Sequence, residues 1–444
     1  MIKKFSMIST VCIAAAVLII GFTGCAYEVA DAKTVPVFAA FTQAPQIRLP
    51  TPEEAERFPQ VTNLPVLYIE LEYIPLEDMT RDIYVPGSYT FIFGEEGGIF
   101  NEPLTIKGRG AWSWSHNKRP YTIELFRETG WGGLPAATKW ILIGNWTDKS
   151  LLRNYITLQL ARRVSNDWAP NCFFADVFIN GEYHGTYLIT ESIEIHRNRL
   201  DLDRATEAIF EIEAIRRHQC HEWCIEIVGG VHHAIFKRPR GSVLPEVRQE
   251  NLAGFRELFA EMQAALSEGY EAYSQFIDVP SFVNWYIVNE FTKNFDSGFT
   301  ASCYVFLKNG KLHMGPAWDF DTPFGNQNVA SIDKLNPVGY HVANSPWFSR
   351  LMRDETFFRL VRERWTELRR EGVFDDFLLM IDNKAEYIAE SARLNFERWP
   401  CALAFTMRPP NVSVFTHEGE VEYLRNWVVL RIEWLDSVWY IEYN

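Results

Sequence analysis

The sequence predicts an α+β fold of two lobes, in which a mixed-sheet lobe precedes a mainly helical lobe. Strand-like apolar runs dominate the first part of the chain, and helical periodicity dominates the last part. An Asn-Gly hairpin signal occurs in each part. The hydrophobic fraction of 47% in 444 residues is sufficient for a large core. We expect the folded part to span residues 61–444, with the sheet-rich lobe at about 61–246 and the helical lobe at about 247–444.

The N-terminal residues have the pattern of a lipoprotein signal peptide. Two lysines near the start precede an apolar run over residues 11–22, and Gly24 precedes Cys25. This run is too short for a membrane span and ends in small residues, as signal peptides do. We therefore expect residues 1–24 to be removed and Cys25 to carry the lipid. The protein would then be exported and anchored at the outer face of the bacterial cell membrane, with an ordinary uncleaved signal-anchor as the alternative.

Residues 25–60 are predicted to be a tether between this anchor and the folded part. They contain alanine-rich stretches, several prolines and little hydrophobic periodicity. The chain as a whole is acidic, with a formal net charge of -14 at pH 7. This charge argues against nucleic acid as a partner, because a phosphate backbone attracts basic surfaces.

The elements of the first lobe follow from short apolar runs. The helical run ends near Val164, and the hairpin turns at Asn180-Gly181, where both residues tolerate positive φ. The expected elements are strands at 66–71, 105–107 and 121–125, a helix at 151–164, and a hairpin of strands at 175–179 and 183–190.

The second lobe begins with an amphipathic pattern over residues 252–266, which predicts a helix. Another helix is expected over the apolar run 282–289, because Pro280 and Ser281 at its start are typical of helix N-termini. A hairpin at 304–314 turns on Asn-Gly, and the chain after residue 346 has a largely helical pattern.

Two aspartates follow that last hairpin directly, in the segment Gly-Pro-Ala-Trp-Asp-Phe-Asp at 315–321. The hairpin would deliver Asp319 and Asp321 to the end of a rigid strand, where functional sites are commonly built. Such a carboxylate pair suits Mg²⁺, and Mg²⁺ suits phosphate chemistry. The alternative is a pair of turn aspartates that accept backbone hydrogen bonds.

A third carboxylate strengthens the phosphate hypothesis. Asp296 lies in the connection between the helix at 282–289 and the hairpin. A chain that turns back at this point would bring Asp296 beside Asp319. Phosphoryl transfer needs such a set, because some carboxylates hold the metal while another orients or deprotonates the attacking hydroxyl.

These motifs resemble the CotH kinase family, atypical kinases related to the spore-coat protein H. The similarity covers roughly residues 61–440, and several ordered blocks are more specific than one motif. The similar blocks are residues 108–110, 114, 118–121, 145, 148–154, 180–183, 185, 187, 190–191, 294–297, 310–312, 314–316, 318–321, 346–347, 362–365, 398–399 and 431–435.

The resemblance implies a two-lobed, atypical protein-kinase-like domain that transfers the γ-phosphoryl group of ATP to Ser or Thr hydroxyls of a protein, with Mg²⁺. It assigns Mg²⁺ to Asp319 and Asp321, and the acceptor hydroxyl to Asp296. Arg153 and Asn154 are expected to be structural, tying the helix start to the loop at Asp148.

The nucleotide-binding residues are expected in the first lobe. Lys118 is expected to reach the phosphates, as kinase lysines do, and Glu191 to pair with it. Arg109, between two glycines, is expected to contact phosphate. The alternatives are a surface lysine, a strand-end glutamate and a plain turn.

The sequence departs from the family pattern near the first block and near the hairpin. Ala111 stands where an Asn is more usual. Ser302 and Cys303 occupy the region where some members carry an Asn that helps to hold metal, and serine is the weaker ligand.

Two other function classes stay open at this point. One is a non-catalytic surface protein that binds a glycan or a protein, because five tryptophans lie between residues 112 and 146. The other is a metal-dependent phosphohydrolase that uses the same aspartates.

The cysteines give a separate, local expectation. Cys220 and Cys224 are predicted to form a local disulfide or to remain thiols. A zinc site with the nearby histidines 218, 221, 232 and 233 is the alternative, although the spacing does not match a standard zinc pattern.

The anchor can be tested at Cys25. Cys25→Ser is expected to leave an unlipidated precursor, whereas the unmodified sequence should yield a mature N-terminus that carries acyl chains. Mass spectrometry of the N-terminal peptide from the expressing cells measures both. Equal N-terminal masses, apart from the substitution itself, would show that Cys25 is not lipidated.

Overall fold

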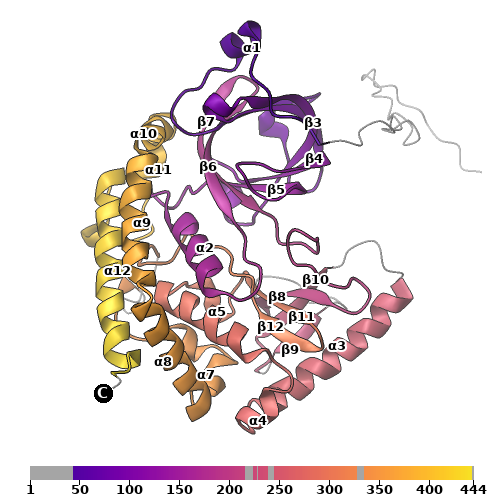
Figure 1. The fold of residues 1–444 in the computed structure, drawn as a ribbon, viewed down its shortest axis with the longest axis vertical. Helices are drawn as coiled ribbons and strands as arrows, with labels where there is room; N and C mark the ends of the chain where they lie inside the picture. The colour runs from indigo at the N-terminus through magenta and orange to yellow at the C-terminus, as the bar shows by residue number, and fades with distance from the viewer. Residues whose placement is uncertain (1–43, 216–223, 228, 239–244, 328–334, 443–444) are drawn as a thin grey trace, which may run out of the picture. The chain divides into compact units, whose positions relative to one another are not determined.

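The computed structural model describes residues 44–442, apart from 216–223, 228, 239–244 and 328–334 (Figure 1). It confirms the α+β class, with a sheet-rich region followed by a largely helical one. The signal peptide, Cys25 and Cys220 lie outside the described residues, so the expectations about lipidation and the Cys220–Cys224 pair stay predictions.

The first lobe is a closed barrel with the strand order β1-β2-β3-β4-β5-β7-β6. Neighbouring strands are antiparallel except β1 and β6, which run parallel and close the barrel. Its strands are β1 Val66–Leu71, β2 Val85–Ile92, β3 Gly98–Gly108, β4 Tyr121–Thr129, β5 Ala137–Ile143, β6 Cys172–Ile179 and β7 Glu182–Glu191. The predicted hairpin turn is confirmed, since Asn180 and Gly181 both have positive φ.

Aromatic side chains pack among aliphatic ones in the barrel interior. Trp131 and Trp140 are fully buried and stack with their ring centroids 5.4 Å apart. Phe91 packs edge-on against Trp131. Trp131 and Trp140 therefore belong to the barrel core, whereas Trp112 of the same five tryptophans is exposed.

The second sheet has the order β12-β11-β8-β10-β9, and all its neighbouring pairs are antiparallel. Its strands are β8 Ala208–Ala214, β9 Cys224–Ile227, β10 His232–Arg238, β11 Cys303–Lys308 and β12 Lys311–Met314. Strands from before and after residue 247 thus pair in one sheet. The structure does not follow a division of the chain at 246 and 247, because β8–β10 belong with the helical region.

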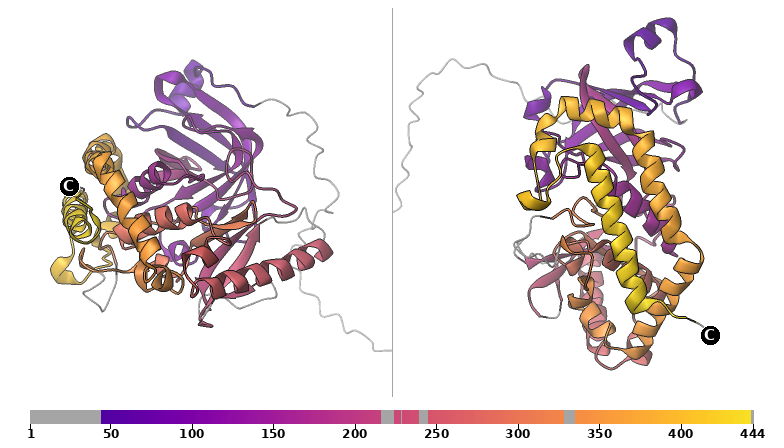
Figure 2. Two further views of the ribbon diagram at one scale, coloured as in Figure 1. Left: turned by 60° about the horizontal axis from the view of Figure 1, so that its bottom comes forward. Right: turned by 90° about the vertical axis from the view of Figure 1, so that its left-hand side faces the viewer.

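Helix α5 Val279–Thr292 lies at the centre of the second lobe, and every residue in it except Pro280 is buried. Asp278 caps its start by accepting a hydrogen bond from the Ser281 backbone amide at 2.9 Å. A helix that is buried on all sides must be enclosed by other elements. The long helices α8 Glu355–Arg370, α9 Val373–Tyr387 and α12 His417–Trp439 lie side by side along one flank (Figures 1 and 2).

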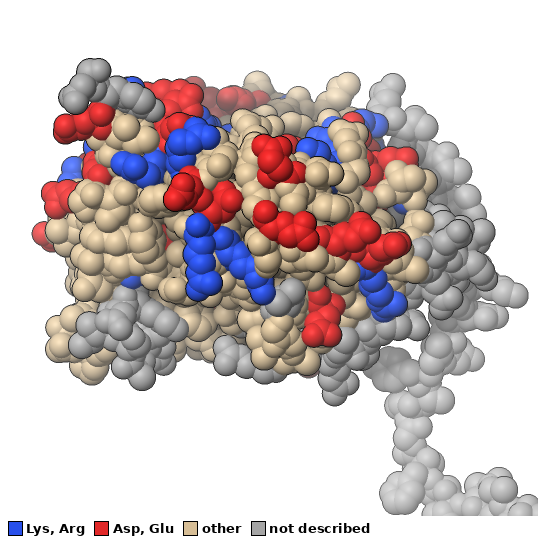
Figure 3. Space-filling model, turned by 90° about the horizontal axis from the view of Figure 1, so that it is seen from below, with Lys and Arg blue, Asp and Glu red and all other residues tan. Residues whose placement is uncertain are grey.

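The remaining helices are α1 Pro52–Arg57, α2 Arg153–Val164, α3 Pro245–Ala265, α4 Tyr270–Tyr273, α7 Phe348–Leu351, α10 Ala389–Arg398 and α11 Pro400–Ala404. In the described part of the chain, no helix combines the length and apolar character that a membrane span requires. On the face that Figure 3 presents, acidic and basic side chains are intermingled.

The predicted tether is too long at its C-terminal end. Arg48 pairs with Gly98 at the edge of β3, with backbone hydrogen bonds of 3.0 and 2.8 Å. Thr51 begins α1 with a capping box that includes Glu54, and Arg48 forms an ion pair with Glu54 at 2.6 Å. Residues from about 48 onward therefore belong to the folded part.

A buried ion pair joins α12 to α5. Arg431 and Glu290 are fully buried and lie 2.9 Å apart (Nη2 to Oε1). Arg431 also donates to the carbonyl oxygens of Phe291, Pro337 and Gly339. Glu290 in turn accepts backbone amides of the segment that leads to η6 Val342–Asn344.

Arg431→Met is expected to lower the free energy of unfolding by about 3–5 kcal/mol, because it leaves the buried Glu290 carboxylate without its counter-ion. Arg359→Met is the matched control, since Arg359 pairs with Glu363 on the exposed side of α8 and should cost at most about 1 kcal/mol. Urea unfolding followed by tryptophan fluorescence measures both. Equal losses for the two variants would mean that the Arg431–Glu290 pair does not hold α12 in place.

Candidate functional site

The two aspartates of the 315–321 segment are delivered by the hairpin of β11 and β12. Asn309 and Gly310 both have positive φ, which gives the tight turn that the sequence predicts. Asp319 itself has φ of 68°, a conformation that costs free energy for a residue with a side chain. Such backbone strain is typical of functional sites, where the surrounding structure enforces it.

Hydrogen bonds with three side chains hold Asp319 and Phe320 in place. Ser302 Oγ donates to Asp319 Oδ2 at 2.9 Å, and Asn294 Nδ2 donates to the Asp319 carbonyl oxygen at 3.3 Å. Asn154 Oδ1 accepts the backbone amide of Phe320 at 2.8 Å, and Phe320 is fully buried. Ser302 thus orients the Asp319 carboxylate.

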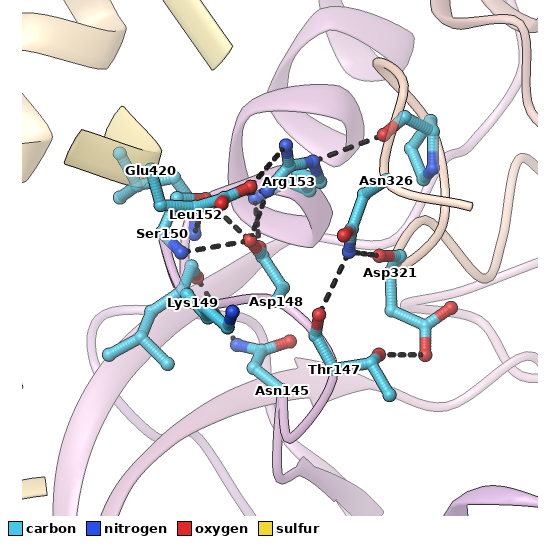
Figure 4. Close-up of polar contacts among 12 residues, drawn as sticks. Asn145, Thr147, Asp148, Lys149, Ser150, Leu152, Arg153, Asp321, Asn326 and Glu420 are labelled. Carbon is cyan, nitrogen blue, oxygen red and sulfur yellow. Dashed lines mark hydrogen bonds and ion pairs between the residues drawn. The ribbon is translucent and has the colours of Figure 1, made fainter. Parts of the chain in front are cut away.

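Asp321 is held by the loop that leaves β5 (Figure 4). Thr147 Oγ1 donates to Asp321 Oδ2 at 3.1 Å. The amide of Asn326 bridges the two segments, because it donates to the carbonyl oxygens of Thr147 and Asp321, each at 2.9 Å. The position of Asp321 therefore depends on residues far away in the sequence.

The base of this loop is a buried ionic cluster around Arg153 (Figure 4). Arg153 Nη1 lies 2.6 Å from Asp148 Oδ1, and Arg153 Nη2 lies 2.8 Å from Glu420 Oε1 of α12. Arg153 Nε donates to the Pro323 carbonyl oxygen at 3.1 Å, two residues beyond Asp321. The structural role predicted for Arg153 and Asn154 is confirmed.

Asp296, Asp319 and Asp321 line one cavity of about 630 Å³. Its walls come from the loop 109–113 after β3, from β8 and β10, from the segment 295–302 before β11, and from the residues after β12. This volume is in the range of sites for small molecules and cofactors. The structure thus brings together the three predicted carboxylates, which come from separate segments.

The carboxylates repel one another in this enclosed space. Burial raises the pKa of the Asp321 carboxyl well above its usual range, and the charges of Asp319 and Asp296 raise it further. A cation in the cavity would reverse this effect, because it favours the ionised form of every carboxylate around it.

Arg109, for which a phosphate contact is predicted, also lines this cavity. Its guanidinium carbon lies 5.3 Å from the ring centroid of Trp318, within the range of a cation–π contact. Burial lowers the pKa of Arg109, while Tyr304 and Asp319 oppose that shift. A guanidinium in this position is suited to bind an anion such as phosphate.

A lysine that the sequence analysis missed also lines the cavity. Lys237 Nζ lies 2.7 Å from Glu211 Oε2 and 3.8 Å from Glu213 Oε1. Glu211 and Glu213 alternate with apolar residues along β8, so they occupy one face of the strand. Two glutamates at a spacing of two in an otherwise apolar strand were the available signal for this wall.

Lys118, which is predicted to reach the phosphates, lies outside this cavity. Its Nζ donates to the Thr186 carbonyl oxygen at 2.5 Å and to Asn395 Oδ1 at 2.6 Å, and the residue is not part of the cavity lining. Burial lowers the pKa of Lys118 to about 7, and the nearby Asp176 opposes that shift. These contacts tie the barrel to α10.

The predicted pair of Lys118 and Glu191 is wrong. Glu191 Oε1 lies 2.5 Å from Arg199 Nη1, and Glu191 Oε2 accepts the Asn171 backbone amide at 2.8 Å. Both carboxylate oxygens are therefore occupied by other donors. At the end of β7, Glu191 thus holds Arg199 and the Asn171 backbone, which is a structural role.

The residues of the cavity fit a divalent cation. Carboxylate oxygens are the ligands that Mg²⁺ prefers. Gln327 adds a further oxygen, because it is buried, lines the cavity and has no hydrogen-bond partner for Oε1 among the described residues. Such an orphaned acceptor is suited to contact a cation directly or through water. Asp319, Asp321 and Gln327 would hold the ion.

A comparison with curated proteins finds no match to this chain. A comparison with protein-family models finds a match to the model described as CotH kinase protein, over residues 106–435. That range contains all the cavity-lining residues and most of both lobes. The matched range covers well over half of the sequence, and the chain therefore belongs to the CotH kinase family, which indicates a phosphotransferase that uses ATP.

Proposed function

We propose that this protein is an exported, lipid-anchored kinase that transfers the γ-phosphoryl group of ATP to Ser or Thr hydroxyls of a protein, with Mg²⁺. The observation that supports it best is the cavity in which Asp296, Asp319 and Asp321 meet Arg109 and Lys237. A carboxylate cluster alone suits any metal site. Carboxylates that share a cavity with two cationic side chains suit a polyphosphate with its metal ion.

The residues of the cavity divide the work of such a transfer. Lys237, held by Glu211, and Arg109 would neutralise the oxygens of the transferred group. The oxygen of the acceptor hydroxyl would bond to the γ-phosphorus while the bond from that phosphorus to the leaving diphosphate breaks. Asp296 would accept the proton that this hydroxyl loses. Mg²⁺, when bound, supplies charge neutralisation at the phosphates.

The exposed tryptophan of the cavity wall suits the base of the nucleotide. Trp112 is 45% exposed and lies beside Gly110 and Ala111 in the lining. Aromatic faces stack on nucleobases without hydrogen-bond readout. The cavity lining thus offers charged side chains for phosphates and an aromatic surface for a base. Export and the lipid anchor rest on residues 1–25 of the sequence.

ATP with Mg²⁺ is expected to stabilise the protein by roughly 2.7 kcal/mol at a hundredfold excess over the dissociation constant. Asp319→Asn should weaken the Mg²⁺ dependence of this stabilisation, because it removes charge from the metal ligand. Asp296→Asn should leave the Mg²⁺ dependence largely intact. Each variant should lower phosphoryl transfer by about a hundredfold or more.

Thermal melts with ATP, with and without Mg²⁺, measure the binding part of this prediction. Transfer to a mixture of Ser- and Thr-containing peptides measures the catalytic part. Equal losses of melting temperature in both variants, without any change in metal response, would favour structural aspartates in a non-catalytic protein. Rapid release of free phosphate without an acceptor would favour a phosphohydrolase.

The two lysines give a further test. Lys237→Met is expected to weaken ATP binding about tenfold or more, because it removes a phosphate-binding charge from the cavity. Lys118→Met should leave ATP binding unchanged but lower the free energy of unfolding by about 1–3 kcal/mol, since Thr186 and Asn395 lose their donor. Isothermal titration with ATP and Mg²⁺ and urea unfolding separate the two effects. Weaker ATP binding in Lys118→Met alone would restore the assignment made from the sequence.

A further inference from the structure

A second hollow, of about 680 Å³, lies next to the catalytic cavity. The two share Phe295, the residue before Asp296. The short segment η5 Asp296–Gly298 separates them, because Asp296 lines the cavity whereas Gly298 lines the second hollow. We name this second hollow the Arg350 groove, after Arg350 in its lining. A polypeptide in this groove would lie next to the carboxylate that receives the acceptor hydroxyl.

The Arg350 groove is basic, although the chain as a whole is acidic. Arg350 and Arg353 line it, together with His232 and His341, and its described lining contains no Asp or Glu. The catalytic cavity, by contrast, is lined by Asp and Glu residues from several segments. The groove is therefore opposite in sign to the chain as a whole, whose formal net charge is -14. The two hollows therefore attract groups of opposite charge.

Arg350, Arg353 and Ser345 have few side-chain partners within the described part of the chain. Arg350 Nη1 donates to the Pro346 carbonyl oxygen at 3.1 Å, and neither Arg350 nor Arg353 forms an ion pair with a described residue. Ser345 is buried, lines the groove, and its Oγ has no hydrogen-bond partner there. A buried hydroxyl without a partner is uncommon and is often completed by a ligand or water.

The floor of the groove is linked to the catalytic segment. His341 Nε2 lies 3.2 Å from the Phe295 carbonyl oxygen, and the two rings stack with centroids 6.3 Å apart. The His341 backbone amide donates to the buried Glu290 at 2.7 Å. A ligand in the groove would therefore contact a rigid wall that continues into Asp296.

We propose that the Arg350 groove binds an acidic segment of the acceptor polypeptide and so places a neighbouring Ser or Thr at Asp296. This inference rests on the proposed kinase function. Carboxylates of the acceptor pair with Arg350 and Arg353, since guanidinium groups bind carboxylates in a bidentate manner. Ser345 Oγ donates to the same segment. The groove thus selects acceptors by charge, while the cavity binds the nucleotide.

Fluorescence anisotropy with two labelled synthetic peptides tests this proposal without any need for catalysis. Both peptides carry one central Ser; its neighbours are Glu in one and Lys in the other. The protein should bind the Glu peptide at least about tenfold tighter, with an affinity that falls as salt rises. The double variant Arg350→Glu/Arg353→Glu should lose that preference. Arg359→Glu, on the exposed side of α8 and outside the groove, is the control and should keep it.

Equal binding of the two peptides, or an unchanged preference in the double variant, would overturn the proposal. An equal loss in Arg359→Glu would also overturn it, because the effect would then reflect overall charge. The melting shift with ATP and Mg²⁺ is measured on the same samples and reports on the catalytic cavity. A peptide preference without that shift would count against the kinase function and not against the groove.

Discussion

The guanidinium of Arg153 is the interaction on which the candidate site depends. It is fully buried, yet it meets two carboxylates and one carbonyl oxygen that come from separate parts of the chain. If the buried guanidinium lost its counter-ions, the free energy of unfolding would fall by several kcal/mol. The two carboxylates and the carbonyl oxygen are therefore held at their positions beside Arg153. A lysine would not replace Arg153, because one ammonium group cannot contact all three partners with the planar geometry of a guanidinium. The loop that carries Asp321 is thereby attached to α2 and α12.

This anchoring lets the cavity hold charges that repel one another. Its described lining contains Arg109 and Lys237 against Asp296, Asp319, Asp321, Glu211 and Glu213. Under the proposed function, this excess of negative charge would disfavour ATP alone in the cavity and favour ATP with a divalent ion. Asp319 has a left-handed backbone conformation, and the pKa of Asp321 is raised. Both features are energetically unfavourable consequences of gathering these carboxylates in one cavity. Both are consistent with a site that is completed by a cation.

The sequence predicted local features well, because local features depend on nearby residues. Turn-forming residues or hydrophobic periodicity were sufficient to predict the Asn-Gly turns, the start of α5 and the aspartates after β12. The closure of the barrel did not, since the parallel pairing of β1 with β6 joins segments about a hundred residues apart. The core role of Trp131 and Trp140 was also missed, because a count of tryptophans says nothing about which way they point.

The choice between two lysines shows the same limit. Lys118 and Lys237 both lie next to strand-like runs, and sequence reasoning preferred the one inside a family block. Lys237 reaches the cavity because β10 pairs with β8, and because the register shifts between Phe236 and Arg238. A bulge redirects side chains locally, and no single-sequence pattern specifies where it falls.

The interleaved second sheet explains why the site needs the whole chain. Glu211 and Lys237 come from strands before residue 247, whereas Tyr304 and the aspartates come from after it. The barrel adds Arg109, and α12 holds Arg153 through Glu420. Neither part of the sequence supplies all the walls of the cavity. The cavity is therefore a product of tertiary pairing, and its acidic lining can stand beside the basic Arg350 groove because η5 separates them.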